Sequence, residues 1–187
     1  MSFPSEYKQG LLRALDTIDL GKVDDAIAAL RRARDEGRHI FVCGNGGSAA
    51  TANHFACDIV KGASFGREKR FRIMALSEQI PTLTAYANDV GYDCVFAEQL
   101  KNFAQPGDVV IAISGSGNSP NVVCAVEFAN SLGCFTIGLT GRDGGKLGQL
   151  VQLDVRVSDD HMGRIEDGHM VICHMLAYHF MDTEPAS

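Results

Sequence analysis

DVVIAISGSGNSPN, residues 108–121, joins a short apolar run to a loop of glycine, serine and asparagine. An apolar run of this length that ends in turn residues is typical of a buried strand. Pro120 suits the first turn of a following helix, because the N–H that proline lacks has no intrahelical partner there. The stretch therefore predicts a buried strand, a tight loop and a helix in succession.

The same order recurs at HIFVCGNGGSAA, residues 39–50, and apolar runs alternate with helical patterns along the rest of the chain. Alternating strands and helices indicate βαβ units, which build a parallel sheet with helices on both faces. We therefore predict a three-layer α/β/α fold with a five-stranded parallel sheet. The predicted strands are 39–44, 72–76, 108–114, 134–140 and 151–157, and the helices between them are 48–61, 79–87, 93–104 and 119–132.

Helical patterns also flank the sheet at both ends. YKQGLLRALDTI and VDDAIAALRRARDEG carry apolar residues at helical spacing and predict an N-terminal helical pair within residues 5–36. A long helix is predicted for residues 162–181, and we expect the DTEPAS tail to fray. Neither a linker nor a repeat interrupts the chain. The prediction is thus one domain over residues 1–187, with its sheet core at 38–157.

Composition argues against several classes of function. The 187 residues carry a net charge of −6 and no basic run, which disfavours a nucleic-acid surface. No apolar run is long enough to cross a membrane, and MSFPSEYKQG at the start does not have the pattern of a signal peptide. The six cysteines stand singly, so we expect reduced thiols in a cytoplasmic protein, with no disulfide framework and no zinc knuckle.

The two glycine-rich loops are candidate phosphate sites. Each follows a strand and opens a helix, and together they offer hydroxyl and N–H donors without a Walker lysine. The alternative is a pair of tight turns with serine caps. Two such loops at the carboxyl ends of parallel strands, where ligands usually bind, weaken that alternative. The predicted phosphate-binding residues are Gly46, Gly47, Ser48, Ser114, Gly115, Ser116 and Ser119.

Two pairs of ionisable residues lie on predicted helices. His54 and Asp58 are four residues apart, and Glu166 and His174 are eight apart, so the members of each pair share a helix face. Two imidazoles and two carboxylates suit either a zinc site or acid–base chemistry beside a carbonyl. For His54 alone, a histidine satisfied by its helix is the alternative, and we interpret His169 as structural.

These motifs resemble a known family. ISGSGNSPN is similar to the serine-rich phosphate loop of sugar isomerase (SIS) domains. Together with GNGGSAATANHFACDIV, TAYANDVGYDCVF, TGRDGGKL and RIEDGHMVICHML, it resembles the bacterial phosphoheptose isomerase family over about residues 20–181. The resemblance implies the SIS fold and an aldose–ketose isomerase. Its reaction would convert D-sedoheptulose 7-phosphate to D-glycero-D-manno-heptose 7-phosphate, for the synthesis of nucleotide-activated heptose.

The resemblance also gives the ionisable residues a common role. In similar proteins four such positions surround the reactive end of the substrate, and some members bind zinc there. His54 and His174 match two family histidines, whereas Asp58 stands in place of Glu and Glu166 in place of Gln. Both replacements keep an oxygen ligand. The resemblance therefore implies a zinc site of His54, Asp58, Glu166 and His174, with Asp58, Glu166 and His174 as catalytic residues.

Asn45 and Asp89 match family pocket residues, with a left-handed turn and an aspartate turn or cap as the alternatives. Because similar proteins are tetramers with pockets at subunit junctions, the expected partners are a sugar phosphate and three further copies of the chain. Two rival functions belong to other classes: a non-enzymatic SIS paralogue that binds the replication initiator DnaA, and a regulatory SIS domain that senses a sugar phosphate. The four ionisable residues favour the enzyme.

Overall fold

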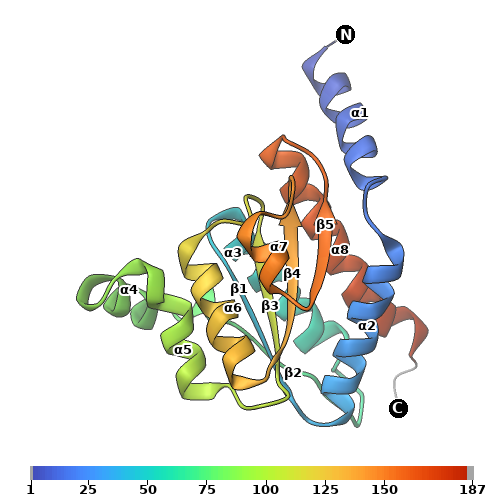
Figure 1. Ribbon diagram of the computed structural model, residues 1–187. Coiled ribbons are helices and arrows are strands. Elements are labelled where there is room, and N and C mark those ends of the chain that lie inside the picture. Colours follow the sequence, from blue (N-terminus) through green and yellow to red (C-terminus); the bar gives the residue numbers. More distant parts are fainter. Residues whose placement is uncertain (1, 185–187) are drawn as a thin grey trace.

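The computed structural model describes residues 2–184 and contains one five-stranded parallel sheet (Figure 1). Its strand order is β2-β1-β3-β4-β5. The predicted sheet is confirmed, and each strand lies within two residues of its predicted bounds. The strands are β1 (His39–Gly44), β2 (Arg72–Ala75), β3 (Val109–Ser114), β4 (Phe135–Gly141) and β5 (Leu153–Val157).

Helices cover both faces of the sheet, as predicted. One core lies between the sheet and α2, α3 and α8, and the other lies between the sheet and α5, α6 and α7. The helices are α1 (Phe3–Leu15), α2 (Leu20–Asp35), α3 (Gly47–Cys57), α4 (Ile80–Asp89), α5 (Val95–Phe103), α6 (Pro120–Leu132), α7 (Gly145–Leu150) and α8 (Met162–Thr183).

Strand β3 shows how the sequence builds the two cores. All six of its residues are buried. Successive side chains on a strand point to opposite faces, so Val109, Ile111 and Ile113 enter the first core while Val110 and Ala112 enter the second. A continuous apolar run is therefore what a central strand between two helical layers requires.

Helix α4 is different, because none of its residues is buried. It projects from the side of the sheet in Figure 1, and α1 extends away from the sheet near the other edge. Within residues 2–184, no helix is both long and apolar enough to cross a membrane.

The structure corrects three details of the predicted elements. The helix expected over 48–61 changes at Asp58 into a π-helical turn, Asp58–Gly62, in which Ala63 N donates to Asp58 O at 3.0 Å. The short helix α7 was not predicted, since a six-residue segment with two glycines has too few apolar positions to show a period. The tail was expected to fray from residue 182, but α8 continues to Thr183 and arginines bind the Glu184 carboxylate. Residues 185–187 lie outside the described part.

Candidate active site

The two glycine–serine loops meet at the carboxyl edge of the sheet, where β1 and β3 end. Between them lies a hollow of about 270 Å³. All seven predicted phosphate-binding residues line it, and so do two further predicted site residues, Asn45 and Glu166. The complete lining is Asn45, Gly46, Gly47, Ser48, Ile113, Ser114, Gly115, Ser116, Ser119, Met162 and Glu166.

The serine hydroxyls of this hollow do not act as helix caps. Ser114 Oγ lies 3.4 Å from Ser116 Oγ and 3.2 Å from Ser119 Oγ. Ser119 precedes α6, yet its side chain makes no capping hydrogen bond. Ser48 is not the N-cap of α3, because Gly46 occupies that position. The serine-cap alternative is therefore wrong, and the hydroxyls form a cluster that an anion can bind.

Glycines let the loops approach their neighbours closely. A methyl group on Gly44 would lie 2.7 Å from Ser48 Cβ, and one on Gly47 would lie 2.6 Å from Glu166 Oε1. Gly46 has φ +53°, a conformation that glycine adopts without steric cost. The first loop thus packs directly on α8, and its residues Gly46, Gly47 and Ser48 line the same hollow as Glu166.

A pair of asparagines joins the two loops. Asn45 Nδ2 donates to Asn121 Oδ1 at 2.8 Å, Asn121 Nδ2 donates to Asn45 Oδ1 at 2.9 Å, and Tyr92 OH donates to the same Asn45 oxygen at 2.9 Å. Asn45 is therefore held by protein partners, and the left-handed turn proposed as its alternative role belongs to Gly46. Sequence reasoning missed Asn121 and Tyr92, since nothing local marks a residue whose partner lies on another loop.

The histidine group lies further along α3 and α8. His54 Nε2 is 3.2 Å from His174 Nε2 and 3.2 Å from Asp58 Oδ2, and His174 Nε2 is 3.8 Å from the same carboxylate oxygen. His54 is exposed, while Asp58 and His174 are half-buried. The structure therefore brings together three residues that stand up to 120 positions apart in the sequence.

These three side chains fit a small divalent cation. Four ligands about 2.1 Å from a tetrahedral zinc ion lie about 3.4 Å from one another. The three observed separations of 3.2, 3.2 and 3.8 Å bracket that value. Glu166, the fourth predicted ligand, is not part of this group, because its carboxylate packs against Gly47 beside the serines.

Helices α3 and α8 run side by side between the hollow and the histidine group. Gly47 faces Glu166 and, seven and eight residues later, His54 faces His174. At 1.5 Å per residue, these intervals separate the two centres by about 10–12 Å. The hydroxyl cluster and the ionisable group thus lie along the outer surface of one helix pair, and we call this strip of surface the groove.

Asp89 is not brought into this groove. It ends α4, is exposed, and accepts a hydrogen bond from Asn88 Nδ2 at 2.7 Å. It lines a separate hollow on α4 together with Pro81, Thr82, Ala85, Tyr86 and Val90. The predicted role of Asp89 in the substrate pocket is therefore not met within one chain.

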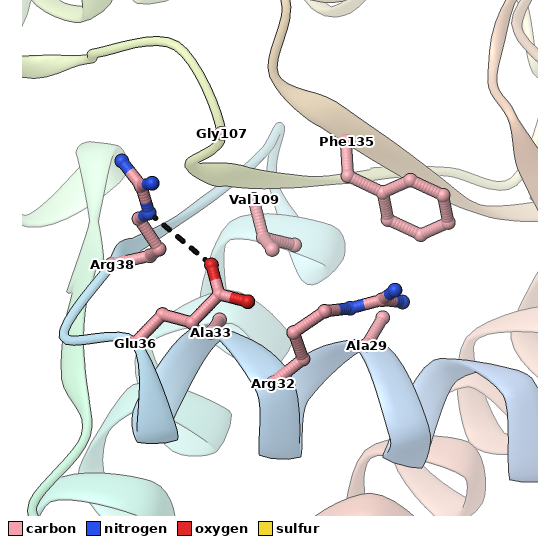
Figure 2. A pocket seen from close by; sticks show the side chains of 8 residues that line it. All are labelled: Ala29, Arg32, Ala33, Glu36, Arg38, Gly107, Val109 and Phe135. Atoms are coloured by element: carbon pink, nitrogen blue, oxygen red, sulfur yellow. Dashed lines mark ion pairs between the residues drawn. The ribbon is translucent and has the colours of Figure 1, made fainter.

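A cavity of about 290 Å³ lies at the opposite, amino edge of the sheet (Figure 2). Figure 2 shows Arg38 turned toward Glu36, and the two groups are 3.5 Å apart. Arg38 also donates to Pro106 O at 3.1 Å. None of the predicted site residues lies here. Since ligands of open parallel sheets bind at the carboxyl edge, the candidate active site remains the groove between α3 and α8.

His169 is fully buried beneath the groove, with Nε2 2.9 Å from Thr140 O. Burial lowers the pKa of its imidazole, although the Thr140 carbonyl and Asp154 act in the opposite direction. Its burial and its hydrogen bond to a strand carbonyl support the interpretation of His169 as structural.

Comparison with known proteins identifies the family. The sequence profile of the SIS domain matches residues 5–141. The chain is 47% identical to phosphoheptose isomerase of Geobacter metallireducens over 141 residues, covering 75% of this chain and 74% of the relative. The chain belongs to the phosphoheptose isomerase family. The family's enzyme from Helicobacter hepaticus is 43% identical over 158 residues, 82% of this chain and 78% of the relative.

A solved structure of the family supports the same assignment. The phosphoheptose isomerase of Neisseria gonorrhoeae superposes with a TM-score of 0.87 at 31% identity, covering 94% of this chain and 95% of that one. Both the predicted SIS fold and the predicted family are thus confirmed.

Proposed function

We propose that this protein isomerises D-sedoheptulose 7-phosphate to D-glycero-D-manno-heptose 7-phosphate, for the synthesis of nucleotide-activated heptose. Membership of the phosphoheptose isomerase family supports the substrate class. The observation that carries the proposal is the arrangement along α3 and α8, with a donor cluster at one end of the helix pair and an ionisable group about two turns further on. An extended seven-carbon chain with its phosphoester spans about 10 Å, which matches the distance of about 10–12 Å between the two centres.

The hydroxyl cluster suits the phosphate. Ser114, Ser116 and Ser119 offer hydroxyls, and the first loop offers backbone N–H groups at the start of α3. No lysine or arginine lines the hollow, and Glu166 adds negative charge to it.

The reaction moves one proton from C1 to C2 of the ketose. A base removes the proton from C1 while the C2 oxygen receives a proton, which gives a cis-enediol. Loss of the O1 proton and protonation of C2 then give the aldehyde at C1. We assign Asp58 or Glu166 as the base and His174 as its partner. Asp58 and His174 stand at the end where C1 would lie, and Glu166 would act there only if its side chain turned away from Gly47.

A zinc ion suits the histidine group. His54, Asp58 and His174 would hold it, and Glu166 would complete the set if its side chain turned from Gly47 toward them. A bound zinc ion would polarise the carbonyl and stabilise the enediolate.

The oligomer belongs to the same proposal. We expect a homotetramer whose substrate sites lie at subunit junctions. Phe3 on α1 and Ile80 on α4 are large apolar residues, exposed by 70% and 65%. Asp89 stands on α4, outside its own chain's groove, so it would serve the substrate site of a neighbouring subunit. The expected cytoplasmic location is supported by the six free cysteines.

The metal requirement gives the first test. We expect a chelator to remove both the bound metal and the isomerase activity, and His54→Ala to do the same, since it deletes one of three converging ligands. His39→Ala, at the other end of β1, is the matched control and should keep both. Elemental analysis and a sedoheptulose 7-phosphate assay measure the two properties. Full activity in a metal-free preparation would contradict the metal assignment and leave acid–base catalysis by Asp58, Glu166 and His174.

A further inference from the structure

Three contacts join α3 and its π-helical extension to α8 at regular intervals. The first two, at the hydroxyl cluster and at the histidine pair, are described above. At the far end, Gly62 packs directly against the side chain of Met181. Gly62 follows His54 by eight residues and Met181 follows His174 by seven, so each contact lies about two helical turns from the next. The two segments are thus aligned along one seam.

Arg67 closes this seam at its third contact. Its guanidinium donates to Gly62 O at 3.0 Å, and to the carbonyls of Phe180, Met181 and Glu184 at 3.0, 3.1 and 2.8 Å. The last four carbonyls of a helix have no intrahelical partner, and a cation there also interacts favourably with the helix dipole. One side chain therefore ties the end of the π-helical turn to the end of α8.

Two other arginines hold the same end of α8 from a different side. Arg31 Nε lies 3.2 Å from the Glu184 carboxylate, and Arg34 forms a short ion pair with it. Burial raises the pKa of Glu184, but the hydrogen bonds from Arg34 and Arg31 outweigh this and keep the pKa below its usual value. Both arginines belong to α2, so they anchor α8 without linking it to the π-helical turn.

We infer that Arg67 is a positioning residue for the group formed by His54, Asp58 and His174. The inference rests on the proposed function, because it takes that group as the metal-binding end of the groove. His54 and Asp58 belong to α3 and the start of the π-helical turn, whereas His174 belongs to α8. Their separations therefore depend on the axial alignment of the two segments.

A small slip between these segments would destroy a metal site. Ligand distances in such sites hold to within about 0.2 Å, whereas neighbouring residues of a helix differ by about 1.5 Å along its axis. Arg67 bonds backbone carbonyls of both segments at their last packing contact, that of Gly62 with Met181. Its removal would leave the alignment to packing alone.

Co²⁺ binding to the purified full-length protein tests the inference, with Arg67→Ala compared against Arg31→Ala. Loss of a residue that orients ligands typically weakens metal binding 10–100-fold, so we expect a Co²⁺ Kd about 10-fold higher in Arg67→Ala and a change below about twofold in Arg31→Ala. Arg67→Lys should fall between wild type and Arg67→Ala, because one ammonium group cannot reach four carbonyls. The imidazole NMR signals of His54 and His174 should shift in Arg67→Ala and stay in place in Arg31→Ala.

Each outcome separates the inference from the proposed function. The inference is overturned if Arg67→Ala keeps its Co²⁺ affinity and its imidazole signals while its melting temperature falls as in Arg31→Ala. Arg67 would then only stabilise the fold. Absence of Co²⁺ binding in the wild type would instead contradict the proposed metal. The imidazole signals would then still decide the role of Arg67, since they report the His54–His174 contact without metal or activity.

Discussion

Glu166 lies at the junction of α8 with the first glycine-rich loop. Its position on a helix with His174 was visible in the sequence. Its place beside Gly47 was not visible, because side-chain direction depends on the packing of two helices. The serine hydroxyls are a similar case, since their spacing pointed to phosphate but only the structure shows that they do not cap α6.

His169 yields a prediction about pH at the residue scale. Burial lowers the pKa of the folded imidazole below the value of about 6.5 found in an unfolded chain. Below that pH the unfolded chain binds a proton that the folded chain does not, so stability is present above it and is lost as pH falls. We expect the free energy of unfolding to drop more from about pH 7.5 to about pH 5 in the wild type than in His169→Gln.

Urea unfolding at both pH values measures this difference. His161→Gln is the control, because His161 is exposed at the start of α8. Equal pH dependence in the wild type and in His169→Gln would show that protonation of His169 does not limit stability in acid.

At the scale of elements, apolar periodicity was sufficient for the strands and the long helices. It was not sufficient for the π-helical turn at Asp58, because one extra residue in a turn does not change which residue types are apolar. It also could not show that the loop after β4 packs on the phosphate loop. Leu147 N donates to Gly117 O at 2.9 Å, and Lys146 N donates to Asn118 Oδ1 at 3.1 Å.

Substitution of Gly117 tests whether the close contact between these two segments stabilises the protein and the serine loop. Gly117 has φ +64°, and a methyl group on it would overlap the Gly144 carbonyl. Gly37 has φ +67° but open space around it, so Gly37→Ala carries the backbone cost alone, about 1–2 kcal/mol. We expect Gly117→Ala to lose more stability than Gly37→Ala and also to weaken binding of inorganic phosphate. Calorimetry measures the stability, and titration measures the phosphate affinity. Equal losses of stability in the two variants, with unchanged phosphate affinity, would show that the contact has no such role.

At the scale of the whole molecule, the alternation of strands and helices predicted the three layers. Because parallel strands end at one edge of the sheet, it also predicted that the two glycine-rich loops meet there. Asp89 lies on α4, outside the groove of its own chain, and its place in a substrate pocket stays a prediction. The assignment of residues 1–187 to one domain stays a prediction.

The proposed tetramer is tested directly by light scattering. Phe3 on α1, Ile80 on α4 and Val90 directly after α4 are exposed by 65–70%, and both helices project from the sheet, so we expect these surfaces to be covered by other copies. A tetramer at micromolar concentration is the expected result, and the double variant Ile80→Ser, Val90→Ser should dissociate. A monomeric wild type would contradict both the tetramer and the role given to Asp89 in a neighbouring site.

We propose that the helix pair α3 and α8 holds the site that isomerises a seven-carbon sugar phosphate. The most direct measurement follows sedoheptulose 7-phosphate by NMR in the presence of purified wild type or His174→Gln. We expect the wild type to form heptose 7-phosphate, and His174→Gln to lose turnover while still binding inorganic phosphate at the serine cluster. A wild type that binds the substrate without converting it, or a variant that turns over as fast as the wild type, would contradict the proposal.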